Sequence, residues 1–406
     1  MRSFVSAVYG LYRTASLLLE GLLRPFFPER LRPLEAGPVD LWIHAASVGE
    51  LRAAEALLVA LKDREPSLRV VLTLQTQSAL GLARRRGLGA QVFPAPWDGP
   101  RTVTRTLETL RPQMLVLVET ELWPNLLAEA LRRGIRVCVV NGRLSDRSFP
   151  RYLALRRLFT PLLQRLSFVG AISERDRERF VALGVPPKRV EVLGNAKYDL
   201  LVRERARVDL TALSARLGLQ EGEKVVVLGS LREGEEVLAR EVAAGLASLE
   251  GTRLVVAPRH LERIPAFRKA LEGLGTPVGL FSRNQTARIL LVDEIGPLFG
   301  LYGLATAAVI GGSFVPRGGQ NPVEPAVWGV PLVFGPHMEN FREEARHLLT
   351  VGGACQAQGA AETITILRRW LTEPQARARA SSALQQGLTQ LLGASQRYAT
   401  RLLRLL

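Results

Sequence analysis

The chain has 406 residues, 47% of them hydrophobic, and its 54 lysines and arginines outnumber 38 aspartates and glutamates. This length is too great for one compact core and predicts two domains of roughly 200 residues. The chain has two cysteines and four histidines. These low numbers argue against a disulfide scaffold and leave few side chains that could bind a metal ion. The net charge of +16 indicates anionic partners. Because the chain has no nucleic-acid reader motif, we expect an acidic membrane surface or acidic substrates rather than nucleic acid.

The first predicted element is a helix within residues 4–27, which are mostly apolar but include Arg13, Glu20 and Arg24. A membrane-spanning helix needs about 20 apolar residues with few charges, so this segment would span poorly. One helical face carries Phe4, Val8, Leu11, Leu18 and Leu22. We therefore expect residues 1–35 to form an amphipathic helix that associates with an anionic membrane surface. A helix packed on its own domain is the alternative.

Strands and helices then alternate through residues 36–210, which predicts a parallel sheet with right-handed crossovers. The strand at residues 41–45 is followed by Ser47-Val-Gly-Glu50, whose serine and glutamate have the spacing of a capping box. Glu50 also stands at the carboxyl end of a strand, where it could face a ligand crevice and act as a general base. At this point both interpretations of Glu50 stay open.

Two later strand ends of this first domain carry charged groups. The strand at residues 114–118 ends in Glu119-Thr-Glu121, which places two carboxylates beside a Trp-Pro step. The strand at residues 190–193 leads to a loop that contains Lys197. We expect these strand ends to supply their carboxylates and the lysine to one cleft.

The alternation breaks in the charged residues 200–223 and resumes afterwards, so we predict a second domain over residues 211–406. The strand at residues 224–228 delivers Gly229-Ser230, and the next one delivers Arg259, a guanidinium suited to phosphate. A long helix or helix pair is expected from residue 374 onwards.

The stretch from Ala308 to Pro336 is the most informative part of this second domain. An apolar strand ends in a glycine loop, after which Asn321-Pro-Val-Glu324 opens a short helix. Asn321 is expected as the N-cap, with Glu324 completing a capping box. Helix capping alone does not explain why Gly318 and Gly319 lead into this helix. A strand, a glycine loop and a helix N-terminus together are typical of phosphate sites.

These patterns predict an α/β protein with two Rossmann-like domains facing across a cleft, as in glycosyltransferases of the GT-B type. A nucleotide would bind the second domain, and a base would act from the first. No DxD-like metal dyad accompanies the nucleotide loops, so we expect a metal-independent mechanism and no cofactor.

Six segments, in order along the chain, resemble the Kdo transferases of lipid A biosynthesis. The segments are residues 43–50, 118–125, 194–199, 257–260, 318–325 and 335–341. The resemblance implies an inverting transferase that moves 3-deoxy-D-manno-octulosonic acid (Kdo) from CMP-Kdo to a lipid A precursor, lipid IVA. It also implies that the enzyme acts at the cytoplasmic face of the inner membrane.

By the same resemblance, Glu50 matches the general base, and Glu119 and Lys197 match residues that assist the transition state. The implied CMP contacts are Pro258, Arg259, Gly296, Pro297, Leu298, Asn321, Pro322, Val323 and Glu324. Two positions depart from the family pattern. Pro297 replaces a glutamate, which removes a side chain and a backbone donor, and Gln320 replaces a histidine, which removes a titratable ring. Both departures bear on nucleotide affinity and donor choice.

Two alternatives accompany this interpretation. A sugar-nucleotide epimerase of the same architecture would need no lipid acceptor. A non-catalytic, membrane-associated protein that binds a sugar nucleotide would need none of Glu50, Glu119 and Lys197, so their joint presence argues against it.

Overall fold

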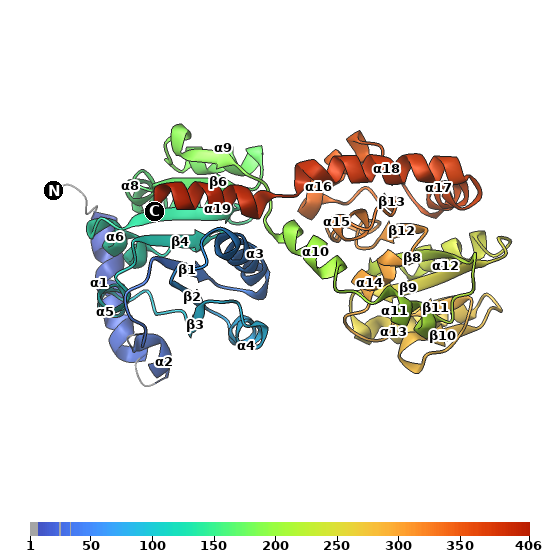
Figure 1. Ribbon diagram of the computed structural model, residues 1–406, viewed down its shortest axis with the longest axis horizontal. Helices are drawn as coiled ribbons and strands as arrows, with labels where there is room; N and C mark the ends of the chain where they lie inside the picture. The colour runs from blue at the N-terminus through green and yellow to red at the C-terminus, as the bar shows by residue number, and fades with distance from the viewer. Residues whose placement is uncertain (1–6, 24–25, 33) are drawn as a thin grey trace. The chain divides into compact units, whose positions relative to one another are not determined.

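The computed structural model describes residues 7–23, 26–32 and 34–406, and its chain divides into two compact units (Figure 1). Unit 1 comprises Met1–Leu200 and Leu392–Leu406, and unit 2 comprises Leu201–Leu391. This division differs from the predicted ranges, 36–210 and 211–406. The difference arises because helix α19 (Ala394–Leu405) packs against helix α3 of unit 1.

Unit 1 is built on a seven-stranded parallel sheet in the order β3-β2-β1-β4-β5-β6-β7. Its strands are β1 (Leu41–Ala45), β2 (Val70–Leu74), β3 (Gln91–Pro94), β4 (Met114–Val118), β5 (Arg136–Gly142), β6 (Phe168–Ala171) and β7 (Val190–Val192). The residues of β1, β2 and β4 are all buried, as expected when helices cover both faces of a parallel sheet. Alternate residues of β1 enter different cores, since Trp42 packs in one cluster and Leu41 and Ile43 in the other.

Helices of unit 1 begin where side chains satisfy free backbone N–H groups. Ser47, Thr76 and Ser173 each accept a hydrogen bond from the backbone N–H three residues later. The helices are α3 (Val48–Arg64), α4 (Gln77–Arg86), α5 (Pro100–Leu110), α6 (Pro124–Arg132), α7 (Phe149–Ala154), α8 (Arg156–Leu163) and α9 (Glu174–Ala182). Helix α10 (Lys197–Arg205) follows β7 and leads into unit 2.

Unit 2 holds a second seven-stranded parallel sheet, in the order β10-β11-β9-β8-β12-β13-β14. Its strands are β8 (Lys224–Leu231), β9 (Thr252–Pro258), β10 (Val278–Leu280), β11 (Ile289–Leu291), β12 (Ala307–Ile310), β13 (Leu332–Phe334) and β14 (Ala354–Gln356). Its helices are α11 (Leu210–Leu217), α12 (Glu236–Gly245), α13 (Ile264–Glu272), α14 (Leu298–Gly303), α15 (Val323–Ala326), α16 (Arg342–Thr350), α17 (Ala360–Thr372) and α18 (Pro374–Leu391). The prediction of parallel α/β sheets in both halves is confirmed.

Each sheet has a central point at which strand order reverses. In unit 1 the reversal lies between β1 and β4, and in unit 2 it lies between β8 and β12. The crossovers on the two sides of such a point leave in opposite directions, so the carboxyl ends of the two strands stay uncovered and form a ligand crevice. Glu50 and Glu119 follow strands that border the reversal of unit 1, and Gly229 lies in the last part of β8, which borders the reversal of unit 2.

Helix α1 (Ala7–Leu23) lies on unit 1 with polar side chains inward. Glu20 is 8% exposed, and its carboxylate accepts hydrogen bonds from the backbone N–H groups of Thr102 and Arg101 at the start of α5. The Tyr12 hydroxyl donates to Asp98, at 2.9 Å. Because Glu20 satisfies N–H groups that an isolated α5 would leave free, α1 is part of the fold of unit 1.

The predicted apolar face of α1 points away from the protein. Leu11 is 74% exposed, Leu18 66% and Leu22 69%, whereas Phe4 and Arg24 lie outside the described residues. No helix in the described part of the chain is both long and apolar enough to cross a bilayer. Helix α1 therefore contacts unit 1 through Tyr9, Tyr12, Ser16 and Glu20, while the leucines of its opposite side are exposed.

Candidate active site

Glu50 occupies the first turn of α3, directly after β1. Its backbone N–H donates to Ser47 Oγ at 3.3 Å, so the predicted capping contact is present. Its carboxylate accepts from the backbone N–H of Ala46 at 2.6 Å and from the Ser47 hydroxyl at 3.3 Å. The second half of a capping box would bond to the N–H of Ser47 itself, so the glutamate departs from that pattern by one residue.

The surroundings of Glu50 disfavour its charged form. Burial raises the pKa of Glu50 first, and the charges of Glu121 and Glu119 raise it further. The N–H of Ala46 and the charge of Lys197 act in the opposite direction, and the resulting pKa is about 8. A carboxylate with such a pKa accepts protons more strongly than an ordinary glutamate, which suits a general base near neutral pH.

Glu119 and Lys197 form an ion pair beside this carboxylate. Lys197 Nζ lies 2.5 Å from Glu119 Oε1, and both side chains are mostly buried. Glu119 has a left-handed backbone, with φ of +57°, a strained conformation that tends to occur at functional sites. An ideal Cβ on Gly49 would lie 3.8 Å from Lys197 Nζ, so the ammonium group also borders the N-terminus of α3.

Asn141, which was not selected from the sequence, links Glu119 to the backbone of Ala196, the residue before Lys197. Its side-chain amide donates to Glu119 Oε1 at 3.4 Å, and its carbonyl oxygen accepts from the N–H of Ala196 at 2.8 Å. The backbone of Asn141 is also left-handed, with φ of +52°. A polar residue directly after a predicted buried strand was the available signal.

Glu121 has the opposite electrostatic character to Glu50. Burial raises the pKa of Glu121, but His44 and the hydrogen bond from Trp123 outweigh it, so the pKa is lowered overall. Trp123 Nε1 donates to Glu121 at 2.8 Å, and His44 Nε2 lies 3.6 Å from the same oxygen. Two neighbouring carboxylates whose pKa values are pushed apart are typical of a site that divides charge and proton transfer between them.

In unit 2, a buried carboxylate holds two loops together at the reversal of strand order. Glu235 accepts from the N–H groups of Arg232 and Gly312, both at 2.7 Å, and from that of Phe314 at 3.0 Å. A Cβ on Gly311 would lie 2.4 Å from the carbonyl oxygen of Ser230, so only glycine fits there. Glu235 was not among the residues selected from the sequence.

Basic side chains stand at the carboxyl ends of β8 and β9. Arg259 is exposed directly after Pro258, and its backbone N–H donates to Leu231 O. Arg232, not selected from the sequence, contacts His260 Nε2 at 2.8 Å. These groups give the crevice of unit 2 the charge that a phosphate requires.

The two remaining predicted nucleotide loops lie at the starts of short helices. Gly296 has φ of +117°, and Pro297 is the N-cap of α14, which begins at Leu298.

The predicted capping box at Asn321 is wrong. Helix α15 begins at Val323 with Pro322 as its N-cap, and Asn321 instead accepts from the N–H of Val323 at 3.1 Å. The Asn321 amide donates to Glu324 at 3.2 Å. The physical reason is that asparagine bonds readily to the backbone two residues on, as in an Asx-turn.

The structure thus brings Glu50, Glu119 and Lys197 into one cluster of unit 1. The predicted nucleotide residues lie at strand ends and helix starts of unit 2. Among the residues that the structure describes, no group of three or more histidine, cysteine, aspartate or glutamate side chains is arranged to hold a metal ion.

Comparison with known proteins identifies close relatives. A family model described as 3-deoxy-D-manno-octulosonic-acid transferase (kdotransferase) matches residues 24–200. The 3-deoxy-D-manno-octulosonic acid transferase of Chlamydia pneumoniae is 32% identical over 355 residues, which cover 86% of this chain and 79% of that protein. A bifunctional glycosyltransferase/methyltransferase of Fusobacterium nucleatum is 32% identical over 362 residues, 84% of this chain but 55% of that longer protein.

A solved structure shares the fold. The UDP-GlcNAc 2-epimerase from Neisseria meningitidis, bound to UDP-GlcNAc, aligns with a TM-score of 0.64 over 90% of this chain and 100% of its own. The sequence identity is 14%, so this likeness concerns architecture only.

The electrostatic account of Glu50 predicts two opposite changes of its pKa. In Glu121→Gln the pKa should fall by about 1, because a neighbouring negative charge is removed, and in Lys197→Met it should rise. Carbon-13 NMR titration of labelled glutamate carboxyls measures both, with Glu50→Gln assigning the signal. A pKa that moves in the same direction in both variants would contradict the account.

Proposed function

This chain belongs to the 3-deoxy-D-manno-octulosonic-acid transferase family, and we therefore propose that it transfers Kdo from CMP-Kdo to a lipid A precursor. The observation that supports the catalytic part of this proposal is the cluster of Glu50, Glu119 and Lys197 at the strand-order reversal of unit 1. Family membership favours a transferase over the epimerase alternative, and it argues against a protein that only binds.

Glu50 is the general base of the proposed reaction. Its carboxylate takes the proton of an acceptor hydroxyl as the hydroxyl oxygen attacks C2 of Kdo. The bond between C2 and the phosphate oxygen breaks, and CMP leaves with the electron pair, so the configuration at C2 inverts. Because the unprotonated Glu50 is the active form and its pKa is about 8, the rate should rise as pH increases through that value.

Unit 2 supplies the donor side. We expect the exposed Arg259 and the neighbouring Arg232 to meet the phosphate of CMP, since guanidinium groups stabilise the charge that develops on it. Glu235 acts indirectly, because it holds the glycine loop against the end of β8. Cationic side chains could neutralise the leaving group without a metal ion, so a metal-independent mechanism remains our prediction.

The two departures from the family pattern affect this donor side differently. Pro297 has no N–H, so that position offers the nucleotide no backbone donor. Gln320 remains beside the glycine loop, because an ideal Cβ on Gly312 would lie 3.4 Å from Gln320 Nε2. Its amide can therefore still donate a hydrogen bond there.

We also propose that α1 docks unit 1 on the cytoplasmic face of the inner membrane. Leu11, Leu18 and Leu22 form an exposed apolar strip, and the bonds of Glu20 keep this strip turned outward. The net charge of +16 would add attraction to anionic lipids, about 1 kcal/mol for each basic residue near the surface. Interfacial binding needs only such partial burial.

The base assignment predicts the effect of Glu50→Gln. Turnover of Kdo onto lipid IVA should fall by about 10² or more, while the affinity for CMP stays unchanged. Mass spectrometry of the lipid product measures the turnover. Glu55→Gln, on the same helix, is the control and should keep near wild-type activity. Near wild-type transfer by Glu50→Gln would leave Glu50 as a capping residue only.

The donor assignment predicts that Arg259→Ala weakens CMP binding about tenfold, which corresponds to ~1.4 kcal/mol. The reason is that a guanidinium bound to phosphate is hard to replace. Calorimetry with CMP measures the dissociation constant. Arg268→Ala serves as the control, because Arg268 pairs with Glu272 on the surface of α13. Equal dissociation constants for the two variants would move the phosphate site away from Arg259.

The docking proposal predicts that replacing Leu11, Leu18 and Leu22 by glutamine reduces flotation with anionic liposomes. The same variant should use a bilayer-embedded acceptor poorly and a detergent-dispersed acceptor well. Substitution is a cleaner test than deletion of residues 1–30, because deletion also removes the bonds of Tyr12 and Glu20. Val237→Gln, at a 63% exposed site in unit 2, is the control. Undiminished flotation of the triple variant would assign docking to another surface.

A further inference from the structure

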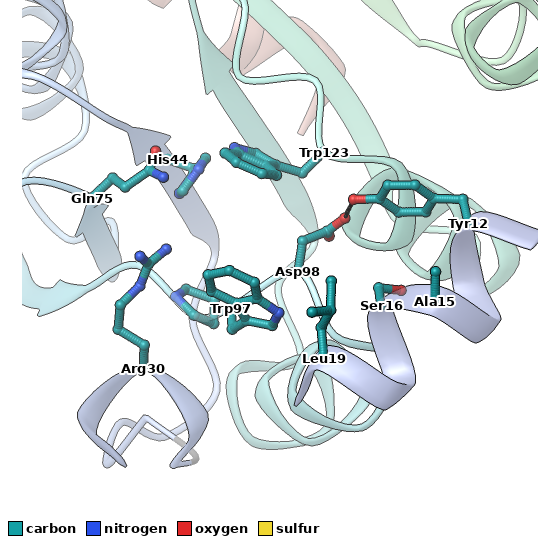
Figure 2. A pocket seen from close by; sticks show the side chains of 11 residues that line it. Tyr12, Ala15, Ser16, Leu19, Arg30, His44, Gln75, Trp97, Asp98 and Trp123 are labelled. Carbon is teal, nitrogen blue, oxygen red and sulfur yellow. Dashed lines mark hydrogen bonds between the residues drawn. The ribbon is translucent and has the colours of Figure 1, made fainter. Parts of the chain in front are cut away.

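Unit 1 contains a cavity of about 130 Å³ between α1 and the carboxyl ends of its strands (Figure 2). Tyr12, Ala15 and Leu19 line it from α1, and Arg30 lines it from α2 (Pro28–Leu31). Figure 2 shows the rings of Trp97 and Trp123 on the other sides.

The size of the cavity favours a narrow occupant. A site for one water needs only about 10–15 Å³, so this cavity is much larger than a packing defect. Pockets for whole drug-sized ligands measure about 300–1,000 Å³, so it is too small for a complete disaccharide. An apolar cavity of about 150 Å³ holds one benzene molecule, so a segment of a hydrocarbon chain suits this intermediate size.

The wall of the cavity is more apolar than its residue types indicate. Asp98 lines it, but its carboxylate already accepts from Tyr12 and from the backbone N–H groups of Asn125 and Leu126. Ser16 also lines it, and its hydroxyl accepts from Asn125 and donates to a carbonyl of α1. Because these polar atoms are paired within the protein, the remaining contacts come largely from aromatic rings and Leu19.

Arg30 contributes a guanidinium group to this wall, which also contains the polar side chains of His44 and Gln75. Its Nε donates to the carbonyl of Ala95 at 3.0 Å, and its guanidinium carbon lies 5.4 Å from the ring centre of Trp97. No carboxylate among the described residues forms an ion pair with it. A half-buried guanidinium next to an apolar cavity suits an amphiphile with an anionic group such as a phosphate.

The cavity connects two features that the proposed function uses. Leu19 lines it and is also 47% exposed beside the outer apolar strip of α1. On the strand side, His44 and Trp123 line it and contact Glu121, which in turn raises the pKa of Glu50. The cavity therefore lies between the surface expected to meet lipid and the surroundings of the base.

We propose that this cavity binds a segment of one acyl chain of the acceptor, with a phosphate of the acceptor on Arg30. The inference rests on the proposed function, because it specifies how a lipid A precursor is held. Burial of the chain would keep the reacting hydroxyl near Glu50, so the acceptor is recognised through its lipid part as well as its sugar.

Fluorescence quenching by an alkyl phosphate with a terminal bromine tests binding without any transfer reaction. Trp97 and Trp123 line the cavity, whereas Trp42, Trp328 and Trp370 do not, so a buried chain quenches a defined pair of indoles. Below its micelle concentration, 12-bromododecyl phosphate should quench saturably. Ala15→Phe, which fills the cavity, should weaken binding at least tenfold, whereas Thr14→Phe on the same helix should not.

Two more variants locate the ligand. Arg30→Gln should weaken binding of the alkyl phosphate but not of the corresponding brominated alcohol. The triple glutamine variant of Leu11, Leu18 and Leu22 should still be quenched. Absence of saturable quenching, equal affinity of Ala15→Phe and Thr14→Phe, or loss of quenching in the triple variant would each overturn the proposal.

A transfer assay separates this inference from the proposed function. Ala15→Phe should raise KM for lipid IVA at least tenfold and leave KM for CMP-Kdo unchanged. If the wild-type chain transfers Kdo but the alkyl phosphate does not bind, only the cavity proposal fails. If the alkyl phosphate binds as described but no Kdo is transferred, the proposed function fails and chain binding stands.

Discussion

Buried carboxylates that accept hydrogen bonds from backbone N–H groups of other segments hold this structure together. Glu20 does so for the start of α5, Asp98 for the start of α6, and Glu235 for the glycine loop of unit 2. The partly buried Asp199 accepts in the same way from the N–H groups of Gly393 and Ser395 at the start of α19. Each bond satisfies a donor that burial would otherwise leave unpaired, a loss that costs about 1–3 kcal/mol. The crevices at the two strand-order reversals keep their shape through such contacts.

The acidic groups around Glu50 differ in what they bond to, and this determines their roles. Glu119 is paired with an ammonium group, and Glu121 is held by an indole N–H near His44. Glu50 receives one backbone N–H and the Ser47 hydroxyl, and it feels the charge of both neighbours. One carboxyl therefore becomes a good proton acceptor because its burial and the charges of the other two raise its pKa. This division of roles needs no group outside unit 1.

Much of this arrangement could be predicted from the sequence because local patterns determine it. Buried parallel strands such as β1 and β4 appear as short apolar runs, and the residue that follows each run is placed at the functional edge of a sheet. This places Glu50 and Glu119 correctly at strand ends. Strand β3 was not predicted, since it has four residues and none of them is fully buried, so no apolar run marks it.

The parts that could not be predicted depend on contacts between distant segments. In the sequence, Glu20 is recognisable only as a charge that disfavours membrane insertion. In the structure it caps a helix 80 residues away. Nothing in the sequence around Glu235 indicated that it bonds to the glycine loop of unit 2. Nothing in residues 392–406 indicated that α19 packs on unit 1. The wrong N-cap at Asn321 has a local cause, because an asparagine before proline can bond to the backbone in two competing ways.

The return of α19 to unit 1 has a consequence for how the protein is made. Residues 201–391 are one continuous stretch of chain, so unit 2 has its whole sequence once Leu391 has been added. Unit 1 does not, because Tyr398, buried in its core, and the partners of Asp199 are added only afterwards. Asp199 lies two residues from Lys197, so the ammonium group beside Glu119 gains its final support late. Nascent chains that stop before α19 would therefore carry all residues of unit 2 and an incomplete unit 1.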